Sequence, residues 1–294
     1  MDERDWLTER FEEHRGHLRA VAYRMLGSLS EADDAVQEAW LRLNRSDTSD
    51  VENLGGWLTT VVARVCLNMM RSRTSRRETP LDVHMPEPIV SPASGVDPEQ
   101  QALLADSVGL ALLVVLETLG PAERLAFVLH DMFAVPFDEI APIVGRTPHA
   151  ARQLASRARR RLQGADVVPD TDITRQREVV DAFFAAARDG NFEALLGVLD
   201  PDVVLRSDSG STRARVPAML RGAQAVASQA LSFANGARFA RPALVNGVAG
   251  VVIAPGGRPV SVIAFTVARG KIVAMDALSD PERLRDLDLT YFDD

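Results

Sequence analysis

Apolar residues recur at helical spacing through the first part of the chain. Spacings of three, four and seven residues place side chains on one face of a helix, so residues 10–77 are expected to be mainly helical. The polar, glycine-containing segment 44–56 interrupts this pattern and is expected to be a loop. Three apolar stripes occur: Phe11, Leu18, Val21 and Met25; then Val36, Trp40 and Leu43; then Trp57, Val61, Val65 and Met69.

Two stretches without a helical pattern are expected to be linkers, one between the two helical segments and one after the second. Residues 78–107 contain five prolines and no periodicity, which indicates a partly extended linker, because proline and the residue before it disfavour a helix. Residues 108–163 again have a helical pattern, and residues 164–173 are expected to be a shorter linker.

The pattern changes after residue 174. Arg175–Arg188 is an amphipathic helix with Val179, Val180, Phe183, Phe184 and Ala187 directed inward. Segments rich in β-branched residues follow, and Asn246-Gly247 and Arg269-Gly270 are typical of tight turns between strands. Helices followed by an antiparallel meander predict an α+β domain. The predicted strands are 202–207, 238–246, 248–254, 259–268 and 271–278.

Residues 136–162 have the pattern of a helix-turn-helix. Phe137–Val144 is expected to be its first helix, although Pro142 falls inside it. Gly145-Arg146-Thr147 is the expected turn, and Pro148–Leu162 is the expected recognition helix. That helix has a narrow apolar stripe on one side, formed by Ala151, Leu154, Ala155, Ala158 and Leu162, and a polar side opposite.

The polar side of this helix suits DNA. Arg152 pairs well with guanine and Gln153 with adenine, whereas the neighbouring arginines suit phosphates. The alternative is a solvated amphipathic helix with no role in DNA binding. The predicted contacts are His149, Arg152, Gln153, Ser156, Arg157 and Arg160, with Arg159 as a further phosphate contact.

The net charge of −8 bears on how such a protein binds DNA. Its arginines cluster at 71–77 and 152–161, while the first forty-odd residues are acidic, so weak binding to bare DNA and a larger partner are expected. The N-terminus shows no signal peptide, and no apolar run is long enough for a membrane span. The single cysteine, Cys66, is expected to be a core residue and fits a reducing cytoplasm.

Two blocks resemble the extracytoplasmic-function sigma factors of bacterial RNA polymerase. LGPAERLAFVLHDMFAVPFDEIAPIVGRTPHAARQLASRARRRL (119–162) resembles their domain 4, and EADDAVQEAWLRL (31–43) with GGWLTTVVARVCLNMMRSRTSRRE (55–78) resembles domain 2. The resemblance implies that core RNA polymerase and promoter DNA are the partners and that 147–162 binds the −35 element. It also implies an acidic helix that binds the clamp helices of the largest polymerase subunit, at Asp33, Asp34, Gln37 and Glu38; an ordinary solvated acidic face is the alternative.

The same resemblance implies recognition of the −10 element by the helix after residue 55. The loop 44–56 takes an extruded base in the family, which favours melting, whereas Trp57 is expected to be core because it lies on an apolar stripe. Contacts to the opened strand are expected from Arg64, Asn68, Arg71, Arg73, Arg76 and Arg77.

The chain continues about 130 residues beyond domain 4, and this part resembles the SnoaL-like branch of the nuclear-transport-factor-like fold. Sigma factors with such an extension form a group that includes mycobacterial sigma factor J. Three motifs resemble that group: HMPEP (84–88), DSGST (208–212) and SDPERL (279–284). The second lacks the lysine of the group, for which Arg213 or Arg215 are candidate replacements. We expect an interdomain regulatory role for Pro86, Glu87, Pro88, Asp208, Asp280, Pro281, Arg283 and Leu284.

The predicted organisation is thus multidomain, with two all-α sigma domains followed by an α+β SnoaL-like domain. Its segments are domain 2 (1–77), a linker (78–107), domain 4 (108–163), a short linker (164–173) and the SnoaL-like domain (174–294). No catalytic residue, metal or cofactor is expected. The alternatives are a stand-alone helix-turn-helix regulator and a SnoaL-like domain that binds or turns over a small ligand, with Asp208 and Asp276 as pocket carboxylates.

Overall fold

The computed structural model describes residues 3–46, 51, 53–76, 85–93, 109–162, 170–210 and 217–292, with backbone alone at 3–6 and 74–76. Their internal contacts form two compact units. The first unit contains Met1–Thr79, Gln101–Ala105 and Val115–Asp166. The second contains Pro80–Gln100, Asp106–Val114 and Val167–Asp294. No described helix is long and apolar enough to cross a membrane.

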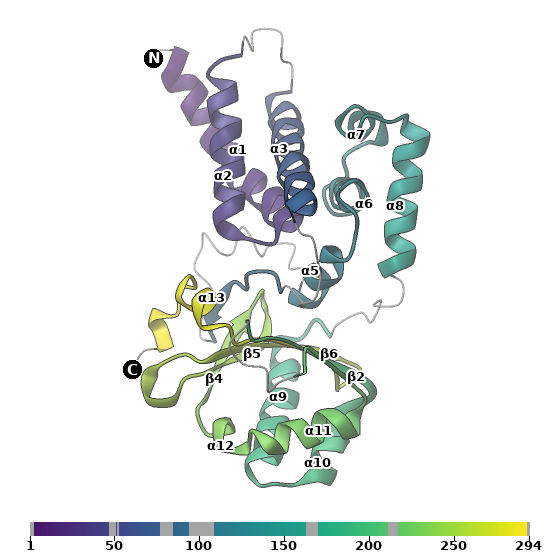
Figure 1. Cartoon of the computed structure of the whole chain (residues 1–294). Helices are drawn as coiled ribbons and strands as arrows, with labels where there is room; N and C mark the ends of the chain where they lie inside the picture. Colours follow the sequence, from purple (N-terminus) through teal and green to yellow (C-terminus); the bar gives the residue numbers. More distant parts are fainter. Residues whose placement is uncertain are drawn as a thin grey trace. The chain divides into compact units, whose positions relative to one another are not determined.

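Three long helices open the first unit: α1 (Glu3–Leu26), α2 (Leu29–Leu43) and α3 (Leu54–Arg76) (Figure 1). Ser28 caps α2 by accepting a hydrogen bond from the backbone N–H of Glu31. The predicted stripes form the core between these helices, where Leu18, Val21 and Met25 are fully buried. Helices therefore form where the apolar spacing predicted them.

A set of shorter helices follows along the chain. Helix α5 (Leu110–Glu117) has its first five residues in the second unit and its last three in the first. The first unit then contains α6 (Pro121–Phe127), the π-helical η1 (Val128–Met132), α7 (Phe137–Val144) and α8 (Pro148–Leu162). Gly145 ends α7 with a φ of 68°, a left-handed conformation that glycine adopts without strain. The predicted helix-turn-helix boundaries are confirmed, and Pro142 lies inside α7 as predicted.

The second unit is a mixed sheet with helices over one face. Helices α9 (Ile173–Arg188), α10 (Phe192–Val198), α11 (Ala223–Ser232) and α12 (Ala234–Ala237) lie on that face (Figure 1). The strands are β1 (Val90–Pro92), β2 (Leu199–Asp208), β3 (Met219–Arg221), β4 (Ala240–Val245), β5 (Val248–Ile253), β6 (Ser261–Ala268) and β7 (Lys271–Leu278). The short helices η2 (Pro255–Gly257), α13 (Pro281–Arg285) and η3 (Thr290–Phe292) complete the unit.

The strand order is β1-β4-β5-β6-β7-β2-β3. Strands β4 to β7 form the predicted antiparallel meander, and both predicted turns have two successive residues with positive φ. The meander is not the whole sheet, because β2 pairs with β7 in parallel and β3 and β1 extend the two edges.

Aromatic residues fill the space between the sheet and its helices. Phe183 and Phe184 of α9 meet Phe265 of β6 with ring centroids 5.8 and 5.9 Å apart. Edge-to-face contacts of this kind stabilise a core beyond simple area burial. The inward face predicted for 175–188 is thus confirmed, with Val180 fully enclosed and Val179 half-buried.

Candidate nucleic-acid interface and linker-docking site

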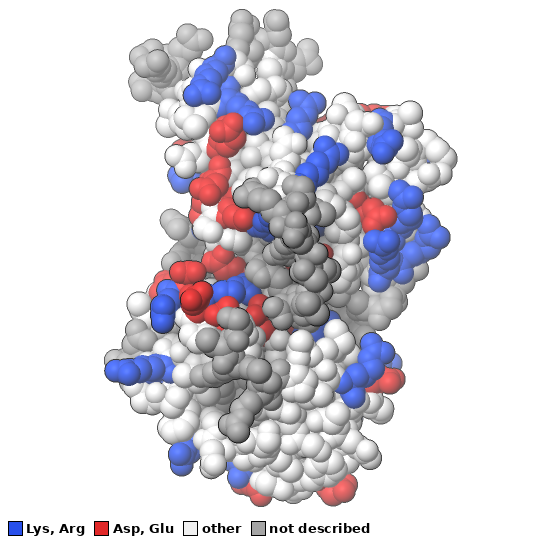
Figure 2. All heavy atoms as spheres, viewed as in Figure 1, with Lys and Arg blue, Asp and Glu red and all other residues white. Residues whose placement is uncertain are grey.

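The outer face of α8 carries the side chains predicted to bind the −35 element. His149, Arg152, Gln153 and Arg160 are exposed there, and Ser156 is half-buried. Ala151, Ala155, Ala158 and Leu162 are buried on the inner face. Basic side chains gather over this helix in the space-filling view (Figure 2). The two-faced character predicted for this helix is present in the structure.

The arginines of α8 divide into two groups by their partners. Arg157 and Arg161 both contact Glu123 of α6, and Arg159 forms an ion pair with Asp131 of η1 at 2.6 Å. These three hold α8 on its own domain. Arg152 instead lies over the ring of Phe137, with 5.3 Å from its guanidinium carbon to the ring centroid.

Two candidate base-reading residues near the start of α8 also have neighbours. The Gln153 amide lies 3.1 Å from the His149 ring nitrogen, one helical turn away. This contact and the Phe137 ring limit the rotamers of Gln153 and Arg152 while leaving both side chains exposed. Limiting rotamers before binding lowers the entropy cost of contact with a base edge.

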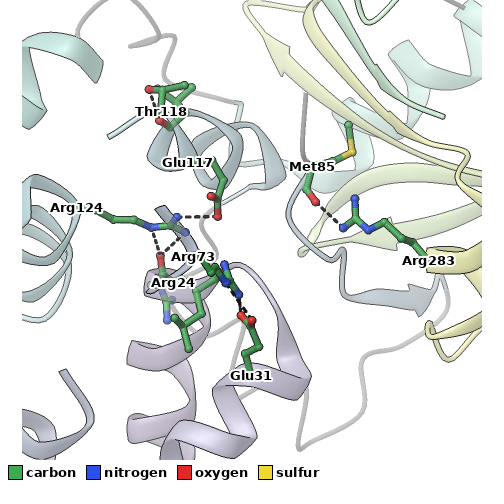
Figure 3. A network of polar contacts seen from close by, with 10 residues as sticks. Arg24, Glu31, Arg73, Met85, Glu117, Thr118, Arg124 and Arg283 are labelled. Atoms are coloured by element: carbon green, nitrogen blue, oxygen red, sulfur yellow. Dashed lines mark hydrogen bonds and ion pairs between the residues drawn. The ribbon is translucent and has the colours of Figure 1, made fainter. Parts of the chain in front are cut away.

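One face of α3 presents polar side chains in the predicted −10 region. Arg64, Asn68 and Arg71 follow at spacings of four and three residues and are all exposed. Arg73 differs: it forms an ion pair with Glu31 and donates to the carbonyl of Leu26 at 3.1 Å (Figure 3). Arg73 therefore ties α3 to the start of α2. The side chain of Arg76 and the whole of Arg77 lie outside the described residues.

A hollow of about 340 Å³ lies beside this face, lined in part by Trp57, Thr60 and Arg64 of α3 and by Glu139 of α7. Trp57 was expected to be core, but it is only half-buried and contributes to the wall of the hollow. The start of α3 is less enclosed than its middle, because Leu54 and Trp57 are half-buried whereas Val61 and Val62 are buried. Residues 47–50 and Glu52 of the predicted base-binding loop lie outside the described residues.

The predicted polymerase-binding residues lie along α2. Asp34 and Gln37 are exposed, whereas Asp33 pairs with Arg19 at 2.6 Å and Glu38 pairs with Arg42 at 2.8 Å. These two pairs are themselves half exposed. Leu41, which the sequence analysis did not select, is 41 % exposed one turn after Gln37. An exposed leucine among acidic and amide groups forms an amphipathic surface suited to a protein partner.

Within the first unit, Arg124 joins the two predicted sigma domains. Its guanidinium donates to the carbonyl of Arg24 at the end of α1 at 3.1 and 3.2 Å and to Glu117 at 2.7 Å (Figure 3). Arg124 is 3 % exposed, so its charge is compensated by these buried acceptors. Sequence analysis missed this residue because its partners lie far away along the chain.

In the second unit, the predicted linker motif docks on the α+β domain. The N–H of Met85 donates to the carboxylate of Asp208 at 3.1 Å, and the guanidinium of Arg283 donates to the carbonyl of Met85 at 2.5 Å (Figure 3). Arg283 also forms an ion pair with Asp208. One residue from each of three predicted motifs therefore meets at a single point, which we call the latch (Met85, Asp208 and Arg283).

The chain after the latch continues as an added strand. Ile89 exchanges hydrogen bonds with Asn246 at 3.0 and 2.8 Å, and β1 then pairs with β4 in antiparallel register. The carbonyl of Ala93 accepts from Arg177 at 2.5 Å. Pro86 and Pro88 are buried and Glu87 is half-buried. Residues 85–93 are thus part of the sheet domain, which the expectation of a separate linker did not include.

The C-terminal motif supports the latch. Asp280 caps α13 by accepting from the N–H of Glu282, Pro281 occupies the first position of that helix, and Leu284 is buried. Gly210 lies so close to Asp280 that a Cβ there would come within 2.7 Å of its carboxylate. Residues 211–216, with Arg213 and Arg215, lie outside the described residues.

Asp208 and Asp276, which are the pocket carboxylates of the ligand-binding alternative, do not line the cavity and are engaged as hydrogen-bonded structural groups. Residues alternate between faces along a strand, so Leu205, Ser207 and Met275 face a cavity, while Asp208 and Asp276 face the other side of the sheet. Asp276 is fully buried and pairs with Arg206 at 2.6 Å. Burial raises the pKa of the Asp276 carboxyl, and the neighbouring Arg206 opposes this shift.

Comparison with known proteins gives the family. Residues 10–76 match the family model for sigma-70 region 2, and residues 109–162 match that for sigma-70 region 4. The chain is 39 % identical to the ECF RNA polymerase sigma factor SigJ of Mycobacterium tuberculosis, over 93 % of this chain and 91 % of the relative. The chain belongs to the extracytoplasmic-function sigma factors of RNA polymerase.

The similarity extends over all parts of this sigma factor. A probable ECF sigma factor SigI of M. tuberculosis is 36 % identical over 97 % of both chains. The crystal structure of M. tuberculosis SigJ superposes with a TM-score of 0.79 at 36 % identity, covering 96 % of this chain and 99 % of that one. The predicted fold class, two helical sigma domains followed by an α+β domain, is therefore confirmed.

Proposed function

We propose that this sigma factor is controlled in cis by its own C-terminal domain, through docking of the chain segment between its two sigma domains. Sigma domains imply core RNA polymerase and promoter DNA as partners. The observation that carries the proposal is the latch, in which Arg283 near the C-terminus contacts both Asp208 and the backbone of Met85.

The covalent length of the linker supports this proposal. Residues 77–108 join the end of α3 to Gly109. As a free, fully extended chain these 32 residues reach at most about 110 Å. When 85–93 is bound, only eight residues remain before it and 15 after it, which reach about 27 and about 50 Å. The docked segment is itself extended, so docking leaves the total reach of the linker nearly unchanged. Docking instead ties the C-terminal domain within about 27 Å of the end of α3 and within about 50 Å of Gly109, which would let that domain limit access to polymerase or DNA.

The proposed contacts with polymerase and DNA follow the exposed faces. We propose that Asp34, Gln37 and Leu41 of α2 bind the clamp helices of the largest polymerase subunit. For the −35 element we propose Arg152 and Gln153 as base-reading residues, with His149 and Arg160 beside them. For the −10 element we propose Arg64, Asn68 and Arg71, which share one exposed face of α3.

For Arg73, Arg157 and Arg159 we propose positioning roles, because each is held by a carboxylate of its own unit. The C-terminal domain is proposed to act as a regulatory module and not as an enzyme. In support, Asp208 and Asp276 are engaged on the face of the sheet that lies opposite the cavity. We propose a cytoplasmic location, because RNA polymerase acts there.

Run-off transcription with purified core polymerase tests the proposal. Promoter-specific transcripts should require this protein in addition to core polymerase, and Arg283→Ala should change their yield at least threefold. Arg285→Ala is the matched control, because Arg285 lies on the same helix and is exposed. Chains that end after Leu162 or after Leu278 should change the yield in the same direction as Arg283→Ala. Equal transcription by wild type and Arg283→Ala would overturn control through the latch.

A further inference from the structure

A cavity of about 250 Å³ lies between the sheet of the second unit and its covering helices. Aromatic and aliphatic side chains form most of its wall, among them Phe183, Phe184, Val226, Ile263 and Met275. Phe233 also lines it and is 53 % exposed, which places this ring at the mouth. The volume is slightly below the range of roughly 300–1,000 Å³ typical of small-molecule sites.

Polar groups are restricted to a few positions on this wall. Ser207, Ser209, Ser261 and Ser279 line the cavity, and the hydroxyl of Ser279 donates to that of Ser261 at 2.8 Å. Ser207 is only 8 % exposed, and its hydroxyl adds a polar group to the cavity wall. A hydroxyl in this position favours a ligand with one complementary polar group.

The strands that form this wall also carry the latch. Ser207 faces the cavity, and Asp208, the next residue, faces the docked segment. The backbone N–H of Ser279 donates to the carbonyl of Asp208 at 2.7 Å, so a cavity-lining residue is bonded directly to a latch residue. A ligand that shifts the ends of β2 and β7 on the cavity face therefore also moves the latch residues on the opposite face, because both faces share one backbone.

We infer that this cavity binds a small, uncharged and predominantly apolar molecule, and that its binding is coupled to docking of residues 85–93. The wall supplies hydroxyl groups and one amide, Gln229, but no formal charge among the described lining residues. An ion placed there would lose its hydration without a charged partner. The coupling rests on the proposed regulatory role of the latch, whereas the binding itself does not.

The full-length protein is titrated with 1-naphthol by isothermal calorimetry, with 1-naphthalenesulfonate as an anionic counterpart of similar size. We expect saturable 1:1 binding of 1-naphthol and at least tenfold weaker binding of the sulfonate. Absence of 1-naphthol binding, or equal affinity for the two probes, would overturn the assignment of ligand chemistry.

Two substitutions on α11 locate the binding. Ala230→Phe places a ring in the cavity and should weaken 1-naphthol binding at least tenfold, because Ala230 is half-buried on the cavity wall. Ala225→Phe is the matched control, since Ala225 is exposed on the same helix and does not line the cavity. Unchanged affinity in Ala230→Phe would show that the probe binds elsewhere.

Coupling is measured as a change of affinity. In Arg283→Ala the dissociation constant of 1-naphthol should differ at least threefold from wild type, and 1-naphthol should alter hydrogen exchange at the Met85 amide correspondingly, because thermodynamic coupling is reciprocal. An identical dissociation constant would overturn the coupling. If Arg283→Ala leaves transcription unchanged while this linkage is observed, the proposed regulatory function fails and the ligand site stands.

Discussion

Arg283 and Asp208, 75 positions apart in the chain, form an ion pair on the sheet face opposite the cavity, and both also contact the backbone of Met85. Asp208 is 9 % and Arg283 21 % exposed as side chains, so water screens the pair weakly. Removing one partner leaves the other charge largely buried and without a counter-ion. Docking of residues 85–93 should therefore depend more strongly on this ion pair than it would on one at the exposed surface.

Replacement of Arg283 by alanine should release Met85. The variant loses the donor to the Met85 carbonyl and leaves the Asp208 carboxylate without its cation. Because hydrogen bonds to a charged group are lost, docking of residues 85–93 should be weakened by about 2 kcal/mol. Hydrogen exchange at the amides of Met85 and Ile89 should become at least tenfold faster. Mass spectrometry of full-length protein checks this, with Arg285→Ala as control; unchanged protection would contradict the role of Arg283.

Replacement of Arg152 by alanine should weaken initiation at promoters with a −35 element. One lost bidentate contact with a base is worth about 1–3 kcal/mol, so the transcript yield at limiting holoenzyme should fall by about fivefold or more. Binding to core polymerase should not change. Arg188→Ala serves as the control, because Arg188 is exposed at the end of α9 and is not among the proposed DNA or polymerase contacts. Loss of polymerase binding in Arg152→Ala would show that the outer face of α8 has another role.

Charge reversal at Asp34 should weaken binding to core polymerase. Asp34 is exposed on α2 beside Gln37 and Leu41, and an arginine there would repel an arginine-bearing partner. A competition assay should show at least a fivefold loss of affinity for Asp34→Arg. The same reversal at Glu9, which is exposed on α1, should have little effect. Equal losses for both variants would indicate a nonspecific effect of net charge.

Cys66 should react with thiol reagents only when the first unit unfolds. It is fully buried in α3, and burial raises the pKa of its thiol from 9.0 to about 12. Since the thiolate is the reactive form, native protein at pH 8 should label far more slowly than protein in denaturant. Fast labelling of native protein would contradict this burial.

The same shift of the Cys66 pKa gives a dependence of stability on pH. Above pH 9 the unfolded state loses the thiol proton while the folded state keeps it, so this group should lower the free energy of unfolding as the pH rises from 9 toward 12. The variant Cys66→Ala should lack this component. Denaturant unfolding of both proteins across that range measures the difference, and parallel pH profiles would contradict it.

Local patterns predicted the elements of this protein well. The apolar stripe of 147–162 and the glycine at 145 were sufficient to place α7, the turn and α8, because both signals act within a few residues. The alternation of strands and the Asn246-Gly247 and Arg269-Gly270 turns likewise placed the meander. The short elements α10 and β3 were not predicted, since a few residues carry little periodicity.

Pairings between distant segments could not be predicted in the same way. Nothing near residue 90 indicates that Val90–Pro92 adds to a sheet beside β4, because an edge strand is selected by the hydrogen-bonding groups it meets. The carboxylate partners of Arg73 and Arg159, which are Glu31 and Asp131, could not be predicted for the same reason. Asp208 was selected as a candidate regulatory residue from the resemblance to a family, whereas its partner atoms could not be predicted.

The sequence by itself determined where helices and strands form, which faces are apolar and which family the chain resembles, because spacing, capping and turn chemistry act over a few residues. Only the tertiary structure decided which face of the sheet each aspartate occupies, which arginines are held by carboxylates and where the proline-rich segment binds. Those outcomes depend on packing between segments far apart in the chain, where the geometry of the partner selects the contact. The latch of Met85, Asp208 and Arg283 is such an outcome, since its three residues come from segments that only the folded sheet brings together.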